Sequence, residues 1–114
     1  VLAMESDSGV FKPSGFGFTG SDRAREIIEQ IASFLDPIEA GEISPSGGGA
    51  DIGPIMKEGV PGMGLNVNSS KYFWYHHTNA DTMDKLDPHD VNLCVAAMAV
   101  MAYVVADLPE TLPR

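Results

Sequence analysis

The sequence predicts an α/β fold, because segments typical of strands alternate along the chain with segments typical of helices. Two helical patterns stand out, one over residues 21–35 and one over residues 87–106. Short extended segments lie before and between them, and glycines and prolines separate the segments without any repeating period. With 114 residues, the chain has the size of one domain.

The first half of the chain predicts two strands and one helix. Residues 1–5 have the apolar character of a buried strand, and residues 10–20, rich in Gly, Phe and Pro, are expected to form a loop. Ser21 is a suitable N-cap for the helix that follows, and Pro37 is expected to stop it. The helix that begins at Ser21 has one apolar stripe, made of Ala24, Ile27, Ile28, Ile31, Ala32 and Leu35. After this helix, residues 42–44 are expected to form a short strand.

The second half predicts a short helix over residues 51–58, with Asp51 near its start and Gly59 after its end. Residues 61–67 and 71–75 are expected to be extended. Asp87 and Pro88 then begin the last helix, as N-cap and first helical residue. Because residues 91–106 are apolar nearly all round, we expect this helix to be buried against a sheet.

The composition excludes some partners. Apolar residues make up 44% and charged residues 20%, which is usual for a soluble globular protein. The net charge of −9 gives no basic surface for nucleic acid, and it disfavours binding to anionic lipid. The longest apolar run, residues 95–106, is shorter than the ~20 residues that span a bilayer. We therefore expect no nucleic acid and no membrane as partners.

The single cysteine, Cys94, cannot form an internal disulfide and is expected to be a small residue of the core. It is a poor candidate for a nucleophile, and the chain also has no Gly-x-Ser-x-Gly motif. The sequence therefore offers no nucleophilic site.

His76 and His77 are the first candidates for chemistry. They follow an aromatic segment, and Asp81 comes four residues after His77. An imidazole held beside a carboxylate suits a metal ligand. A pair of partly buried, hydrogen-bonded histidines in a turn would give the same pattern, so both interpretations stay open. His89, in the first turn of the last helix, is expected to be solvated.

Asp7 and Asp51 are the carboxylate candidates. Asp7 follows the first strand among small polar residues, where it could ligate a metal or stabilise a turn. Asp51 follows the glycines 47–49 and could be a plain helix cap. The glycines either let the backbone approach a ligand or form a flexible turn, and they lack the Lys-Ser/Thr of a phosphate loop.

Several short motifs resemble, in their order, the M28 metallopeptidases, and within them the carboxypeptidase Q branch. They extend over essentially all 114 residues. The motifs are Glu5-Ser6-Asp7-Ser8-Gly9, Phe18-Thr19-Gly20-Ser21, Gly49-Ala50-Asp51-Ile52, Gly59-Val60-Pro61-Gly62, Tyr75-His76-His77-Thr78 with Asp81-Thr82, and Tyr103-Val104-Val105-Ala106-Asp107.

The resemblance implies a mixed β-sheet flanked by helices, which is the zinc-exopeptidase-like, phosphorylase/hydrolase-like architecture. Residues 1–114 would be the C-terminal portion of a single catalytic domain, incomplete at its N-terminal side. The complete protein would bind two zinc ions and hydrolyse peptides or dipeptides by means of a metal-bridged water. A secreted, periplasmic or lysosomal location is also suggested by the resemblance.

The resemblance also assigns roles to individual residues. It implies that Asp7 ligates one zinc and that His77 ligates the other, since the sequence from His77 to Thr82 matches the family pattern His-Thr-x-x-Asp-Thr. His76, Asp51 and Asp81 would lie beside the ligands or on the substrate side. No general base is expected within this chain, because it has no Glu-Glu pair, and a His-x-Asp segment for the remaining ligands is also missing. Ile52 stands where many members have His or Tyr.

Two hypotheses therefore remain. The chain is part of a zinc exopeptidase, or it is a non-catalytic relative that keeps the fold for binding or assembly. Side chains of Asp7 and His77 that point away from each other would favour the second. In either case the incomplete sheet would leave strand edges and apolar helix faces exposed, so we expect the isolated chain to self-associate.

Overall fold

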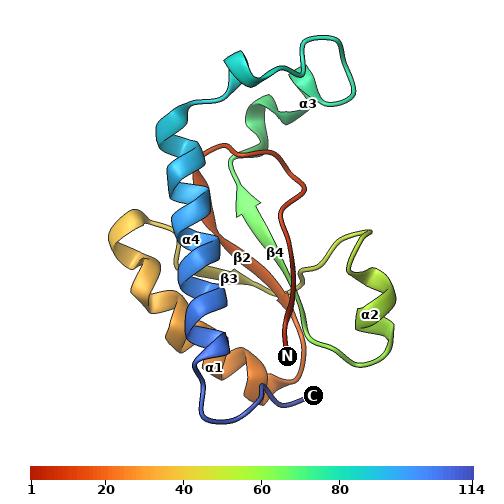
Figure 1. The fold of residues 1–114 in the computed structure, drawn as a ribbon, viewed down its shortest axis with the longest axis vertical. Helices are drawn as coiled ribbons and strands as arrows, with labels where there is room; N and C mark the ends of the chain where they lie inside the picture. The colour runs from red at the N-terminus through yellow and green to blue at the C-terminus, as the bar shows by residue number, and fades with distance from the viewer.

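The computed structural model describes all 114 residues and contains a four-stranded mixed sheet (Figure 1). The strand order is β1-β4-β2-β3, with β1 parallel to β4, β4 antiparallel to β2, and β2 parallel to β3. The strands are β1 (Ala3–Glu5), β2 (Pro13–Thr19), β3 (Glu42–Ser44) and β4 (Gly62–Val67). The expected mixed sheet flanked by helices is confirmed.

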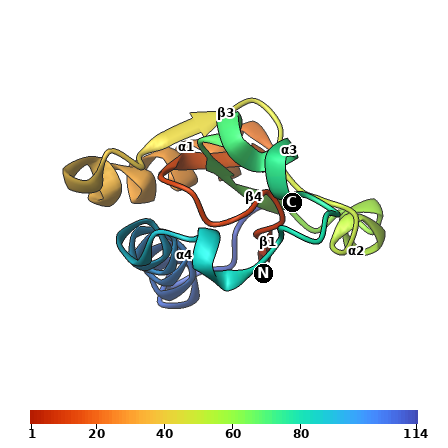
Figure 2. The same cartoon turned by 90° about the horizontal axis from the view of Figure 1, so that it is seen from above.

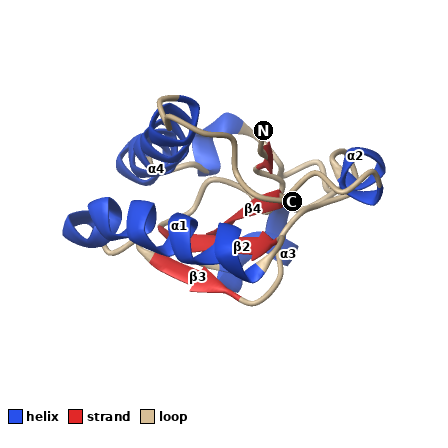
Figure 3. Cartoon of the chain, turned by 90° about the horizontal axis from the view of Figure 1, so that it is seen from below, coloured by secondary structure: helices blue, strands red, loops and turns tan.

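The two longer helices, α1 (Asp22–Ala32) and α4 (Pro88–Ala106), lie on the same side of the sheet (Figure 3). Two short helices, α2 (Gly53–Lys57) and α3 (Tyr72–Tyr75), lie outside this layer, and α2 stands on the far side of β1 from α4 (Figure 2). Three 3-10 segments complete the chain: η1 (Ser33–Ile38), η2 (Ser69–Lys71) and η3 (Met83–Lys85).

The core lies between the sheet and this two-helix layer. Phe16 and Phe18 of β2, and Met63 and Leu65 of β4, alternate along their strands with residues that face the other way. They belong to a cluster of 14 buried residues that also includes Ala24, Ile28, Ile31 and Ala32 of α1 and Cys94, Ala97 and Met101 of α4.

Capping explains where the long helices begin, as predicted. The hydroxyl of Ser21 accepts a hydrogen bond from the amide of Ala24 at 3.2 Å, and the carboxylate of Asp87 accepts one from the amide of His89 at 2.8 Å. The end of α1 differs in detail, because the chain continues as a 3-10 helix through Pro37 to Ile38. Pro37 has no N–H for an α-helical bond, and the chain turns away at Glu39, whose φ is 57°.

The loop expected over residues 10–20 is wrong, because β2 is a central strand that pairs on both sides. Phe16 and Phe18 already have the two-residue period of a strand, and the glycines between them serve close packing instead of a turn. The extended segment expected over residues 71–75 is also wrong. The side chain of Asn68 accepts a hydrogen bond from the amide of Ser70 at 3.0 Å and starts a helical turn there.

Helix α4 packs against the sheet, as expected, but it is buried on one side only, although its residues are apolar nearly all round. Cys94, Ala97 and Met101 are buried, whereas Val95 is 62% and Tyr103 is 72% exposed, since no other element of this chain covers that side. By length and composition alone, the 19 residues of α4 are enough to cross a membrane, although the uninterrupted apolar run within them is shorter than a bilayer span. Core helices of soluble proteins meet the same criteria.

Candidate metal-binding site

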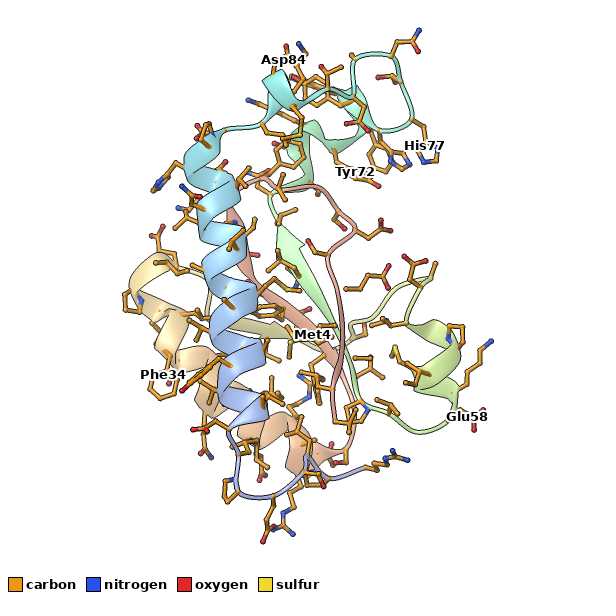
Figure 4. All side chains as sticks on the ribbon, viewed as in Figure 1. Met4, Phe34, Glu58, Tyr72, His77 and Asp84 are labelled. Carbon is orange, nitrogen blue, oxygen red and sulfur yellow. The ribbon has the colours of Figure 1, made fainter.

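The segment after β1 and the segment after α3 enclose a hollow of about 270 Å³. Asp7 comes from the first segment and His77 from the second, 70 positions later in the chain. His76, Asp81, Tyr72 and Lys85 also line the hollow. In Figure 4, His77 and Tyr72 lie together at the end of the molecule beyond β4. The fold therefore brings Asp7, His76, His77 and Asp81 to one place.

The two histidines form a stack with Tyr72. The ring of His76 lies between Tyr72, at a centroid distance of 4.5 Å, and His77, at 3.9 Å, with interplanar angles of 26° and 24°. The stack restricts the rotation of both imidazoles. His76 is half-buried, whereas His77 is exposed and no group of the chain forms a hydrogen bond with its ring. The nitrogens of His77 are therefore free to bind a ligand.

The backbone of His77 has a φ of 55°, in the left-handed region that side chains with a β-carbon seldom occupy. The turn that follows holds this conformation. The Thr78 hydroxyl donates to the carbonyl of Tyr75 at 2.8 Å and accepts from the amide of Ala80 at 3.2 Å. The amide of Asp81 donates to the carbonyl of Thr78 at 3.1 Å, which places the Asp81 side chain at the wall of the hollow.

One ion pair lies beside the hollow. Lys85 binds the carboxylate of Asp84, which raises the pKa of Lys85 through the hydrogen bond and the charge of Asp84. The same bond, together with one from the hydroxyl of Thr82, lowers the pKa of Asp84. Both groups are thus charged at neutral pH, and Lys85 brings a positive charge to a wall that also carries Asp7 and Asp81.

Asp51 does not line this hollow. The possible role of Asp51 as a helix cap is also not realised, since α2 begins at Gly53 and no side chain caps it in the usual way. Instead, the carboxylate of Glu5 in β1 accepts a hydrogen bond from the amide of Ile52 at 3.3 Å. Glu5 belongs to the Glu5-Ser6-Asp7-Ser8-Gly9 motif, but the sequence alone assigns it no role. Met4 packs against the core, and successive residues of a strand face opposite sides of the sheet, so Glu5 faces away from the core.

The remaining candidates lie elsewhere. Cys94 is buried in the core, as expected, and its thiol donates to the carbonyl of Phe11 at 3.1 Å. Burial, and to a smaller extent the charge of Asp90, raise the pKa of the Cys94 thiol, which disfavours the reactive thiolate. His89 is exposed at the start of α4.

Carboxylate oxygen and imidazole nitrogen are both zinc donors, so Asp7 and His77 fit as part of a zinc site. A complete site needs more ligands, and no group of three or more His, Cys, Asp or Glu side chains in this chain is placed to hold a metal ion. The chain thus offers two donors at an open hollow, which are fewer than a complete zinc site needs.

Known proteins are similar to this chain in both sequence and fold. The model of peptidase family M28 matches residues 2–103. Carboxypeptidase Q of Bos taurus is 50% identical over 113 residues, and that of Homo sapiens is 46% identical over the same length. In both cases the match covers 99% of this chain and 24% of the relative.

A solved structure supports the same relationship. The crystal structure of a peptidase M28 precursor from Shewanella amazonensis SB2B aligns with a TM-score of 0.90 and 30% identity, over 99% of this chain and 26% of that protein. The chain therefore spans about a quarter of the length of the relatives that it matches. From the family match and these identities, the chain belongs to peptidase family M28.

Proposed function

We propose that this chain is the C-terminal portion of the catalytic domain of a two-zinc exopeptidase that hydrolyses peptides or dipeptides. The main observation behind the proposal is that Asp7 and His77 line the same hollow, although 70 positions separate them in the sequence. Membership of a peptidase family supports it. A plain scaffold would give no reason for these two side chains to share a hollow.

In this proposal Asp7 and His77 each hold one of the two zinc ions. Zinc in such a site polarises the scissile carbonyl and lowers the pKa of a bound water. The stack with His76 and Tyr72 holds the imidazole of His77 in one orientation, so little rotational freedom is lost when it binds.

The left-handed backbone of His77 also supports a functional role. A residue other than glycine in this region costs roughly 1–2 kcal/mol. Backbone strain of this kind is concentrated at active sites and ligand-binding positions. A glycine at position 77 would avoid the cost but would provide no imidazole. The conformation therefore fits a position where the side chain is needed for binding.

The test is to replace the two ligands in the complete protein. Asp7→Asn and His77→Ala are each expected to lower the zinc content after dialysis from two ions per chain toward one and to abolish dipeptide hydrolysis. Matched controls are Asp107→Asn and His89→Ala, both at exposed ends of α4, which should retain metal and activity.

The alternative is a non-catalytic M28-like module that serves binding or assembly. The lack of a complete metal-binding cluster within the chain is the observation that favours it. A complete protein that retains no zinc and hydrolyses no dipeptide, while it is folded, would establish this alternative and contradict the proposal.

A further inference from the structure

Four residues form a row across the sheet, one from each strand. Ser44 pairs with Gly17, Gly17 pairs with Gly64, and Gly64 pairs with Glu5, in the strand order β3-β2-β4-β1. On β2 and β4 the neighbours of this row are the phenylalanines, Met63 and Leu65, which face the helices. The row therefore faces the opposite side of the sheet.

The chain leaves β3 at Ser44 and crosses this row as residues 46–49, which we term the glycine strap. A β-carbon on Gly17 would lie 2.2 Å from the carbonyl oxygen of Ser46. A β-carbon on Gly64 would lie 3.2 Å from the carbonyl oxygen of Gly48. The contacts of the strap thus follow the order of the strands, and they join backbone to backbone.

Glu5 makes the last contact of the strap, on β1, and it does so with a side chain. A β-carbon on Gly49 would lie 2.3 Å from the carboxyl carbon of Glu5, so the carboxylate fills the space that the glycine leaves. Oε2 accepts the hydrogen bond from the Ile52 amide, while Oε1 is buried and receives no bond from any group of the chain. Burial of a carboxylate oxygen in this way costs free energy, which a purely structural contact would avoid with an uncharged residue.

The place of Glu5 in the chain links this contact to the hollow. Glu5 is the last residue of β1, and Asp7 follows two positions later, already outside the sheet and exposed. No group of the chain forms a hydrogen bond with the Asp7 side chain. The direction in which residues 6 and 7 leave the strand is therefore set by the end of β1.

We propose that Glu5 is a positioning residue for the zinc site. Its carboxylate, held between Gly49 and Ile52, fixes the end of β1 and so places Asp7 at the hollow. This inference rests on the proposed function, because Asp7 is a metal ligand only under that proposal. The glycine strap thus supports the end of β1, from which the chain continues to Asp7.

The experiment measures zinc affinity by competition with a chelator, in the folded complete protein. Glu5→Ala removes the carboxylate, and Gly49→Ala displaces it by steric overlap. Each is expected to weaken zinc binding about 10-fold or more, as loss of groups that orient metal ligands usually does. The double variant should be no weaker than the worse single variant, because both changes break the same contact.

Two controls test the specificity of the effect. Glu5→Gln keeps an oxygen that accepts from the Ile52 amide and should restore most of the affinity. Gly53→Ala is a matched change at the start of α2, where an added β-carbon would meet nothing within 4 Å, and it should bind zinc as the wild type does. Amide hydrogen exchange provides a readout that needs no metal, and Ile52 should exchange faster in Glu5→Ala and Gly49→Ala.

The outcomes separate this inference from the proposed function. If Glu5→Ala lowers only the melting temperature and the folded protein binds zinc normally, while Asp7→Asn loses zinc, Glu5 is merely structural and the inference is wrong. If Asp7→Asn itself retains both zinc ions, the proposed function and the inference both fail.

Discussion

Arg25 donates a hydrogen bond from its guanidinium to the backbone carbonyl of Phe18 at 2.6 Å, which joins the first turn of α1 to the end of β2. The same guanidinium donates to the carbonyls of Pro45, at 2.9 Å, and Ser44, at 3.3 Å. Its carbon lies 5.4 Å from the centre of the Phe18 ring. One side chain thus joins α1 to the end of β2, to the end of β3 and to the residue that precedes the glycine strap.

Replacement of Arg25 should destabilise the fold. Arg25→Ala leaves three carbonyls without their donor, and hydrogen bonds to charged groups contribute about 1.5–3 kcal/mol each at most, so we expect a loss of about 2 kcal/mol or more. Arg25→Lys should recover only part of it, since an ammonium cannot reach three acceptors with the planar geometry of a guanidinium. Urea unfolding measures the effect. Arg23→Ala, on the exposed side of α1, is the control and should change little.

Gly17→Ala should be among the most damaging single-methyl changes in the chain. The new β-carbon would lie 2.2 Å from a backbone oxygen of the strap, so β2 and the strap would have to separate. We expect a loss of about 3 kcal/mol, at the upper end of the range for overpacking. Thermal unfolding provides the measurement. Gly53→Ala should stay within about 1 kcal/mol of the wild type, and equal effects at positions 17 and 53 would contradict the strap contact.

Cys94 should make stability depend on pH in alkaline solution. Burial raises the pKa of its thiol above the ordinary value of 9.0, so the folded protein keeps the proton at a pH where the unfolded chain has released it. The contribution is complete below the unfolded pKa, and it decreases as the pH rises from there toward the folded pKa. Between pH 8 and 10 the wild type should lose more unfolding free energy than Cys94→Ala does. Parallel pH profiles of the two proteins would show that the thiol titrates normally.

The isolated 114-residue chain should self-associate in solution. Strand β1 lies at an edge of the sheet, and an apolar groove of about 470 Å³ lies between it and the end of α4, lined by Val1, Leu2, Met4, Ala102, Val105 and Leu108. Open strand edges and apolar helix faces of this kind favour association. Sedimentation velocity should show species larger than a monomer at micromolar concentration.

Two substitutions on the outer side of α4 test the cause of this association. Val95→Lys and Tyr103→Lys place charges on its exposed apolar face and should together shift the distribution toward monomer. Gln30→Lys, on the exposed side of α1, adds the same charge elsewhere and should not. A wild-type chain that sediments as a clean monomer would be the contrary result.

Most of the fold could be predicted from local patterns. The caps at Ser21 and Asp87 predicted the starts of α1 and α4, and short segments bounded by turn residues predicted β1, β3 and β4. The predictions were wrong where a residue type is common in two different kinds of structure. Glycines in β2 resembled a loop, but they serve contacts with a segment about 30 positions away, which no local pattern reveals. The aromatic residues of α3 favour strands by propensity, and the cap at Asn68 decides for a helical turn instead.

The candidate site could be predicted only as separate residues. The sequence suggested Asp7 and His77 but could not show that they line one hollow, because their meeting depends on the pairing of β1 with β4. It also could not assign a role to Glu5, whose partners, Gly49 and Ile52, become neighbours only when the strap crosses the sheet. The roles of Asp7 and His77 as ligands stay predictions until metal binding is measured.

The glycine strap has a consequence for how inactive variants are interpreted. Where Gly17 and Gly47 meet, backbone contacts backbone, so no side chain there can change its rotamer to make room for a new β-carbon, and we expect almost no substitution to be tolerated at these two glycines. A random library would therefore yield two kinds of inactive clone. Clones altered at Asp7 or His77 would remain soluble and well folded, whereas clones altered at Gly17 or Gly47 would be lost from the soluble fraction. Intolerance to substitution at these glycines would thus be explained by the close approach of two backbones and would not indicate a role in catalysis.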